Sequence, residues 1–159
     1  MTRIEHLARA DRLELSEMLE GEEDSPQHLL HLYQRPSGPD ENLIAWRGGL
    51  IDGLLTGTTR HDFSDNREFS GFDLPRSPHA LLTRIHVRHT ARGCGIGRAL
   101  AAQFAAEAIE HGCGFIGGYL DGTSDTTGRR AFFERLGFVV SRFDSFGGRP
   151  DEVLASATR

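Results

Sequence analysis

The sequence predicts an α/β protein, and three observations support that fold class. The first is a glycine-rich stretch at residues 92–97, which lies between an apolar strand pattern at 80–87 and a helical pattern at 96–111. The second is a strand–turn–strand pattern at 43–59, and the third is another strand followed by a helix at 115–137. Strands that alternate with helices bury their apolar faces by packing the helices against a sheet.

The N-terminal segment predicts one strand and two helices. Residues 2–6 form a short strand pattern, and Asp11 is then placed to cap a helix, with Glu14 in the capping-box position. The apolar face of this helix consists of Leu15, Met18 and Leu19. A second short helix is predicted at 26–33, where a Ser-Pro pair provides the cap and the first turn.

The middle of the chain predicts a hairpin followed by a long loop. Strands at 43–46 and 50–59 are joined by two consecutive glycines, which favour a tight turn, and Gly53 and Gly57 indicate bulges or close approach. Residues 60–78 are the least regular part of the chain, because phenylalanines alternate there with charged residues. A loop of this length in a compact domain has a function or lacks fixed structure. We expect either the wall of a ligand pocket or a mobile insertion.

The strand at 80–87 is expected at the centre of the sheet, because its apolar character is nearly continuous. Strict alternation places its side chains on two faces, with Leu81, Thr83, Ile85 and Val87 on one and Leu82, Arg84 and His86 on the other. A buried arginine needs a partner, so we expect Arg84 to form a structural ion pair. The chain after the glycine-rich stretch predicts a strand at 115–122, a last helix that ends at Gly137, and closing strands at 138–143 and 151–156.

The stretch at 92–97 reads Arg-Gly-Cys-Gly-Ile-Gly and is the main functional signal of the chain. Glycines at alternate positions leave main-chain N–H groups able to turn toward one anion. The helix that begins there adds unpaired N–H donors and the positive end of its dipole. Arg92 and Arg98 add formal charge at the rim. The stretch therefore predicts a pyrophosphate site.

Two other phosphate-binding patterns are excluded. A nucleoside-triphosphate P-loop ends in Gly-Lys-Ser/Thr, and the chain contains no lysine. A dinucleotide fingerprint requires a third glycine three positions after the second, and counted from Gly93 and Gly95 that position holds Arg98. The pattern present is instead Arg-x-x-Gly-x-Gly, formed by Arg92, Gly95 and Gly97.

With the strand before it and the helix after it, this pattern resembles the acyl-CoA loop of the GCN5-related N-acetyltransferases (GNAT). A second block, Phe-Glu-Arg-Leu-Gly-Phe at 133–138, is similar to the Tyr-Glu-Lys-Leu-Gly-Phe of that family. The resemblance implies a single GNAT domain over residues 1–159, with a mixed sheet of about six or seven strands and about four flanking helices. It also implies that the sheet splays apart between the strands at 80–87 and 115–122.

The chemistry that this resemblance implies is direct transfer of an acetyl group from acetyl-CoA to a primary amine, without a metal. The cofactor arm is expected in the splay, where main-chain N–H groups polarise the thioester carbonyl. Carried over by position, the cofactor-binding residues are Ile85, His86, Val87, Arg92, Gly93, Cys94, Gly95, Ile96, Gly97, Arg98, Thr126 and Phe133.

Two residues are candidates for the general base that the amine needs. Counting back from Phe133 places Asp121 at the end of the strand, whereas counting forward from Gly97 places Tyr119 there, so both stay open. Phe133 itself occupies the position where many relatives have the tyrosine that protonates the leaving thiolate. The acid is therefore elsewhere, with Tyr119 as one alternative, or it is dispensable, because a thiol with a pKa of about 8.5 is a tolerable leaving group.

Composition limits the remaining possibilities. The net charge of −5 argues against a general nucleic-acid binder, and no apolar run is long enough to cross a membrane. The N-terminus lacks the apolar core of a secretory signal, and two cysteines are too few for a disulfide framework, so we expect a cytoplasmic protein. A homodimer is an expectation by analogy with the family alone.

We therefore expect an acetyl-CoA-dependent N-acetyltransferase that acts on a small-molecule or peptide amine. An alternative is an acyl-CoA-sensing domain with little or no turnover, which the phenylalanine at position 133 favours. A third possibility is the transfer of a longer acyl group.

Overall fold

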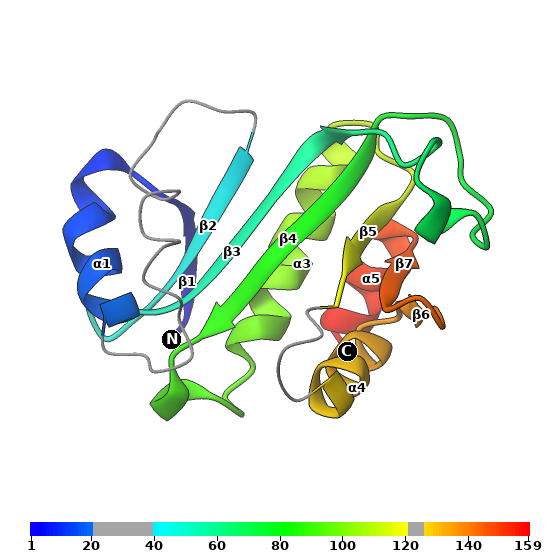
Figure 1. Ribbon diagram of the computed structural model, residues 1–159. Helices are drawn as coiled ribbons and strands as arrows, with labels where there is room; N and C mark the ends of the chain where they lie inside the picture. The colour runs from blue at the N-terminus through cyan, green and yellow to red at the C-terminus, as the bar shows by residue number, and fades with distance from the viewer. Residues whose placement is uncertain (21–39, 121–125) are drawn as a thin grey trace.

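The computed structural model describes residues 1–20, 40–120 and 126–159, which form a seven-stranded sheet in the order β1-β2-β3-β4-β5-β7-β6 (Figure 1). The strands are β1 (Arg3–His6), β2 (Asp40–Arg47), β3 (Leu50–His61), β4 (His79–Val87), β5 (Ile116–Tyr119), β6 (Val139–Val140) and β7 (Ser145–Gly148). The α-helices are α1 (Arg12–Glu20), α3 (Ile96–Glu110), α4 (Thr126–Arg135) and α5 (Pro150–Ala157), with 3₁₀ turns η1 (Arg9–Asp11), η3 (Arg67–Phe69) and η4 (His89–Ala91). The predicted fold class is confirmed. None of the helices described is long and apolar enough to cross a lipid bilayer.

The sheet is mixed, because β4 and β5 are parallel while every other neighbouring pair is antiparallel. The two parallel strands are paired only at Ala80–Ile116 and Leu81–Gly117, although β4 continues to Val87. Beyond these pairs the strands diverge, as Figure 1 shows toward their C-terminal ends. This divergence is the predicted splay.

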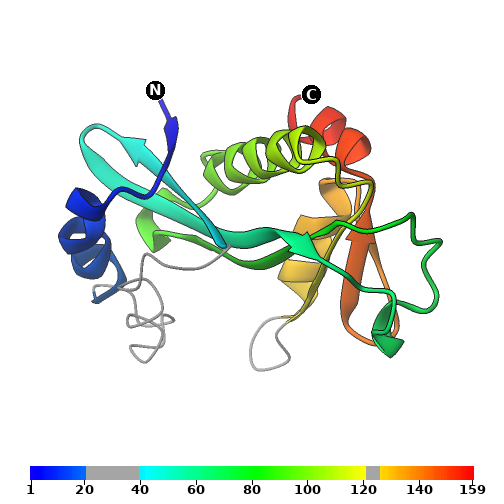
Figure 2. The same cartoon turned by 90° about the horizontal axis from the view of Figure 1, so that it is seen from above.

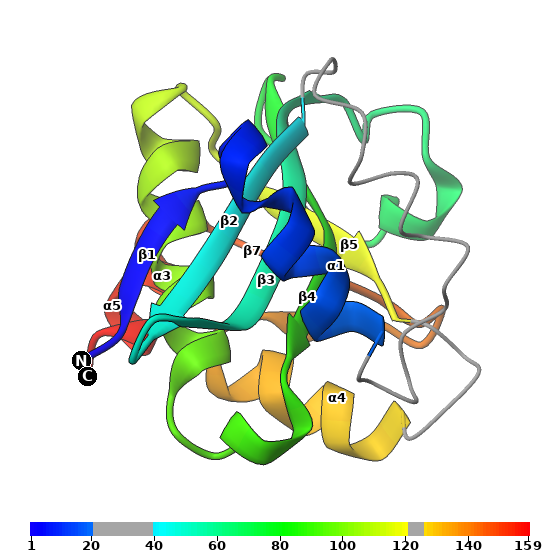
Figure 3. The same cartoon turned by 90° about the vertical axis from the view of Figure 1, so that its left-hand side faces the viewer.

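Helices cover the two faces of the sheet at different places. Helix α3 packs on one face with α5 beside it (Figure 2). Leu100 and Phe104 of α3 are fully buried in the main core. Helix α1 covers the opposite face of β2 and β3 (Figure 3), where the predicted apolar face is buried against Ile44, Ile51 and Leu54. A third cluster joins Phe63 and Phe69, from the segment between β3 and β4, to Phe115, which directly precedes β5.

Strand β4 departs from the alternation that the sequence predicts. Its register against β3 shifts after Thr56–Arg84, so that Leu82 pairs with Gly57 and Thr83 is an extra, exposed residue. An extra residue in one strand reverses the facing of every side chain beyond it. Ile85 therefore packs on the main core beside α3 together with Leu82, and not on the face opposite to it.

The half-buried Arg84 forms no ion pair with any residue in the described ranges, so the expected structural ion pair is not found there. It faces away from α3, since the bulge places its neighbour Ile85 on the core side. A half-buried guanidinium keeps part of its hydration, which lowers the need for a partner.

The C-terminal segment differs most from prediction. Residues 151–156 are helical, and the strand beside β5 is Ser145–Gly148, which lies in the predicted linker. Pro150 opens helix α5, acidic residues follow in its first turn, and Val153 and Ala157, four positions apart, are buried. These are helix signals, and they outweigh the apolar content that suggested a strand.

Two N-terminal predictions are also revised or left open. Asp11 is not the N-cap, because the helical segment begins one turn earlier at Arg9 and the Asp11 carboxylate accepts a hydrogen bond from the N–H of Ala8 at 3.0 Å. The helix predicted at 26–33 lies outside the described residues. The hairpin is confirmed, and both glycines of its turn have positive φ, of 59° and 82°.

The segment 62–78 is anchored to the sheet. The side chains of Phe63 and Phe69 are fully buried against Phe115, with Phe72 packed beside them. The burial of these rings argues against a mobile insertion, and the role of the segment as the wall of a ligand pocket stays a prediction.

Candidate cofactor loop and catalytic site

The predicted phosphate loop connects β4 to α3 through the short turn η4. Gly93 and Gly95 both have φ of +81°, a conformation that side-chain-bearing residues rarely adopt, and each faces open space. Gly97 is helical, and a β-carbon there would lie 3.1 Å from the Phe132 ring of α4. The three glycines thus serve two purposes, since two permit the turn and the third permits α4 to approach.

Several consecutive main-chain donors of this loop have no main-chain partner among the described residues. The first N–H of α3 with a main-chain partner is that of Ala99, which donates to Gly95 O at 3.0 Å. Gly95 is the N-cap residue and provides no side-chain cap. The N–H groups from Gly93 to Arg98 therefore form no main-chain hydrogen bond with the residues that the structure describes. A run of such donors at the start of a 15-residue helix fits a diphosphate.

Arg98 does not contribute its side chain to this loop. Its guanidinium donates to Ser156 O at 3.0 Å, Ala157 O at 2.9 Å and Arg159 O at 2.5 Å. It therefore caps the C-terminal end of α5, where a positive charge is favoured by the helix dipole. The positive charge that we expected Arg98 to add at the edge of the loop is directed away from the loop, although the main-chain N–H of Arg98 stays in it.

Another arginine is close to the loop and was not predicted. Arg47, at the end of β2, donates from Nε to the carboxylate of Asp52 at 2.9 Å, and Arg88 approaches the same carboxylate at 3.2 Å. Hydrogen bonding to Cys94, and then to Asp52, raises the pKa of Arg47. Asp52 is 5% exposed. Arg92 is exposed and donates to Val87 O at 3.1 Å, so the loop has Arg47 on one side and Arg92 within it.

The residues predicted on β4 fall on both faces. Ile85 and Val87 pack against the core that α3 covers, whereas His86 pairs with Leu54, whose side chain belongs to the α1 face. The three residues lie where β4 has separated from β5, so their main-chain groups line the divergence. His86 is half-buried on the face of the sheet that α1 covers.

The two residues predicted on α4 occupy different places. Thr126 is the first residue of α4. Phe133 is 8% exposed and stacks on Phe146 of β7, with ring centroids 4.0 Å apart. Its ring is therefore a core group.

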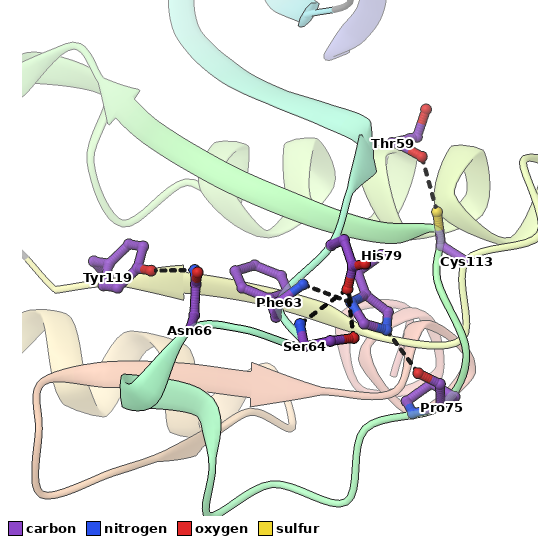
Figure 4. A network of polar contacts seen from close by, with 9 residues as sticks. Thr59, Phe63, Ser64, Asn66, Pro75, His79, Cys113 and Tyr119 are labelled. Carbon is purple, nitrogen blue, oxygen red and sulfur yellow. Dashed lines mark hydrogen bonds and ion pairs between the residues drawn. The ribbon is translucent and has the colours of Figure 1, made fainter.

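Of the two candidate bases, Asp121 lies outside the described residues and Tyr119 ends β5. Tyr119 is 46% exposed, and its hydroxyl accepts a hydrogen bond from Asn66 Nδ2 at 2.8 Å (Figure 4). Burial of the hydroxyl and the charge of Glu68 raise its pKa, while the Asn66 bond acts in the opposite direction. The phenol is therefore neutral across the neutral pH range, which suits a proton donor better than a base.

A shallow cleft of about 480 Å³ lies at the opposite ends of β4 and α3 from the loop. Its lining includes His61 and His111. Burial and the neighbouring His79 lower the pKa of His61, and its buried Nε2 has no hydrogen-bond partner among the described residues. This cleft is distant in the fold from the divergence of β4 and β5.

One group of described residues has the composition of a metal site, although no metal was expected. The His6 imidazole lies 2.6 Å from a carboxylate oxygen of Glu107 and 3.3 Å from one of Glu41. Glu107 is 6% exposed and belongs to α3, whereas His6 belongs to the edge strand β1. The imidazole between two carboxylates ties the edge strand to the helix, while the second carboxylate oxygen of Glu107, Oε2, is buried with no hydrogen-bond partner among the described residues.

Asn66 and Arg47 are the polar residues of the site that sequence reasoning missed. Each is brought to its place by tertiary structure, because Asn66 lies 53 positions before Tyr119 and Arg47 lies on a hairpin far from the loop in sequence. No local pattern marks either residue.

Comparisons with known proteins agree with this geometry. The model of the acetyltransferase (GNAT) family matches residues 2–138. No curated protein sequence matches the chain. Three solved structures illustrate the similarity of fold. A transcriptional regulator from Bacillus halodurans C-125 has a TM-score of 0.70 at 21% identity, over 89% of this chain and 95% of that one.

The other two structures are acetyltransferases. AAC(6')-Iy, solved with the bisubstrate analogue CoA-S-monomethyl-acetylneamine, has a TM-score of 0.69 at 17% identity, over 87% of this chain and 91% of that one. The ribosomal-protein-S18-alanine N-acetyltransferase from Escherichia coli has a TM-score of 0.67 at 16% identity, over 92% of this chain and 91% of that one. With its glycine-rich loop, its divergent central strands and a family match over most of its length, this chain belongs to the GNAT acetyltransferase family.

Proposed function

We propose that this protein is an acetyl-CoA-dependent N-acetyltransferase that acts on a small-molecule or peptide primary amine. The observation that carries the proposal is the run of main-chain N–H groups between Gly93 and Arg98 that have no main-chain partner among the described residues, at the end of the strand that diverges from its parallel neighbour. Acetyl-CoA supplies a thioester whose carbonyl carbon accepts the amine. In this proposal no metal takes part.

The loop holds the diphosphate in this proposal. Two glycines with positive φ turn their amides outward, and the first turn of α3 adds further donors, so the anion is bound mainly by main chain. Arg92 and Arg47 add charge nearby. Gly93, Cys94, Gly95, Ile96, Gly97 and Arg98 contribute through their main chain, and Cys94 needs no role as a nucleophile.

The divergence between β4 and β5 takes the arm of the cofactor. Alternation along β4 directs the main-chain N–H groups of Ile85 and Val87 toward β5, because that of Arg88 donates to Asp52 O of β3, and strands that separate leave these two groups without a β5 partner. Such groups suit the oxyanion that forms when the amine attacks. The amine nitrogen forms a bond to the carbonyl carbon and loses a proton. The carbon–sulfur bond then breaks, and the electron pair stays on sulfur.

Two side chains are proposed for the proton transfers. Asp121, as a carboxylate following β5, is the base that accepts the amine proton. Tyr119 is the acid, because its raised pKa keeps it protonated and Phe133 has no proton to donate. The proposed acid differs from the family pattern in its position, because the tyrosine hydroxyl comes from β5 and not from α4.

Calorimetry with CoA tests the loop. Gly95→Ala is expected to raise the Kd for CoA at least about tenfold, because a non-glycine residue at φ of +81° costs about 1–2 kcal/mol and tilts the amides. Gly112→Ala is the matched control, since Gly112 ends the same helix with φ of +78° and also faces open space. An unchanged Kd for Gly95→Ala, or no uptake of CoA by the wild type, contradicts the proposal.

Release of free thiol from acetyl-CoA in the presence of a panel of amines tests the transfer itself. We expect the wild type to release thiol, and we expect the Asp121→Asn and Tyr119→Phe variants to release it more slowly. Binding of CoA without thiol release from any amine supports the alternative, an acyl-CoA sensor. A preference for longer acyl donors supports the transfer of a larger group.

A further inference from the structure

The hydroxyl of Tyr119 is held by a residue from a distant part of the chain. Asn66 Nδ2 donates to Tyr119 Oη at 2.8 Å (Figure 4). The Tyr119 ring also packs edge-on against Phe69, at 5.3 Å between centroids. Both contacts come from the segment that connects β3 to β4. The position of the phenol is thus set from outside its own strand.

The segment that carries Asn66 is rigidly fixed. The N–H of Asn66 donates to Phe63 O at 2.9 Å, and the N–H of Phe69 donates to Asn66 O at 3.0 Å, while both phenylalanine rings are fully buried. Fully buried His79 also accepts a hydrogen bond at Nδ1 from the N–H of Phe63 at 3.0 Å. A side chain that stands between two buried anchors is pre-organised for its partner.

The direction of the hydrogen bond decides what the phenol can do. An amide nitrogen only donates, so the Tyr119 oxygen accepts from Asn66 and its own hydrogen is not used in that bond. Nothing within residues 1–20, 40–120 and 126–159 accepts that hydrogen. The O–H donor is therefore available at the end of β5, where β4 has already diverged.

We propose that Asn66 is a positioning residue, which holds the Tyr119 hydroxyl so that its hydrogen is free to protonate the sulfur of the leaving thiolate. This inference rests on the proposed function. When the carbon–sulfur bond breaks, the proton passes from Tyr119 Oη to sulfur, and the phenolate is stabilised by the Asn66 N–H. Solvent then returns a proton to the phenolate, which balances the proton that the amine released.

Ionisation of Tyr119 can be measured without any substrate. The chain has two tyrosines, so a Tyr33→Phe background leaves Tyr119 as the only phenol, and its ionisation is followed by near-ultraviolet absorbance. Asn66→Ala is expected to raise the pKa of Tyr119, since a donor to the phenolate is lost, and Asn66→Asp is expected to raise it further. Glu68→Gln is expected to lower it, because a nearby negative charge is removed.

Kinetics test whether Asn66 acts through Tyr119. Asn66→Ala and Tyr119→Phe are each expected to lower kcat about tenfold or more with little change in the KM for the amine, and the double variant is expected to be no slower than Tyr119→Phe alone. Asn66→Asp is expected to be slower than Asn66→Ala, because a carboxylate would accept the phenol hydrogen. Ser64→Ala is the matched control, since Ser64 lies in the same segment and its hydroxyl donates a hydrogen bond to Asp62, not to Asn66 or Tyr119.

The outcomes separate this inference from the proposed function. Additive losses in the double variant, an unmoved pKa in Asn66→Ala, or an Asn66→Asp enzyme faster than Asn66→Ala each overturn the inference while the transferase activity stands. Absence of thiol release from the wild type, with CoA bound, overturns the proposed function and the role of Asn66 with it. Far-ultraviolet circular dichroism at each pH and thermal unfolding of each variant identify any loss of folding.

Discussion

The ring of Phe133 lies nearly parallel to the ring of Phe146, with centroids 4.0 Å apart and an angle of 16° between the planes. The pair joins α4 to β7, and both residues are at most 8% exposed. Phe138 meets both rings edge-on, so three aromatic side chains close this part of the core. The position where many relatives have a tyrosine is therefore used here for packing.

A tyrosine introduced at position 133 is expected to destabilise the folded protein. Phe133→Tyr places a hydroxyl in an aromatic cluster, so we expect the free energy of unfolding to fall by about 1–3 kcal/mol. Thiol release is expected to show no gain, because in the proposed mechanism Tyr119 is the acid. Denaturant unfolding measures the first effect, and Phe143→Tyr is the control, since that ring is 55% exposed. A faster Phe133→Tyr enzyme of unchanged stability would contradict this account.

The two arginines of the loop are expected to have separate effects. Arg98→Met removes the cap on the C-terminal carbonyls of α5, and charged hydrogen bonds of this kind contribute about 1.5–3 kcal/mol to stability. The Kd for CoA is expected to change little, because the main-chain N–H is retained. Arg92→Met is expected to show the converse, with near-native stability and a Kd about tenfold higher. Thermal unfolding and calorimetry on the same samples distinguish the two, and equal effects on binding would show that Arg98 also reaches the cofactor.

Close packing at Gly57 is expected to make this position intolerant of a side chain. A β-carbon there would lie 2.6 Å from Leu81 O and 2.7 Å from the Phe104 ring, beside the bulge that sets the register of β4. We expect Gly57→Ala to lower the free energy of unfolding by about 1–3 kcal/mol. Gly71→Ala is the control, because nothing lies within 4 Å of a β-carbon at that position. Equal stability of the two variants would mean that the helix can move away from the sheet at no cost.

Acid is expected to destabilise the fold through His61. Burial, followed by the neighbouring His79, lowers its pKa in the folded protein below the ordinary value of 6.5, and its Nε2 is buried without a partner among the described residues. Below that ordinary value the unfolded chain binds a proton more readily than the folded one, so the contribution of His61 to stability is present above about pH 6.5 and is lost as the pH falls through the folded pKa. In His61→Phe, which keeps an aromatic ring against Phe63, the melting temperature is expected to fall less steeply with acid. Identical pH profiles would exclude His61 as the cause.

The loop and the order of the elements could be predicted because their signals are local. Glycines at 93 and 95 adopt the positive φ that the sequence suggested, and the four-residue repeat of Ile96, Leu100 and Phe104 faces the core. Both depend on residues within a few positions of one another. The error at 151–156 was also local, since the proline and the acidic first turn were available in the sequence as helix signals.

The sequence by itself determined that a glycine-rich turn ends a strand and begins a helix, because main-chain conformation there depends on the absence of side chains over a few consecutive residues. Only the tertiary structure decided which side chains surround that turn. The bulge at Thr83 reverses the facing of half of β4, Arg98 caps a helix 58 to 61 residues away, and Asn66 contacts Tyr119, 53 positions later in the chain. Such contacts follow from strand register and from the packing of distant segments, which no local pattern encodes.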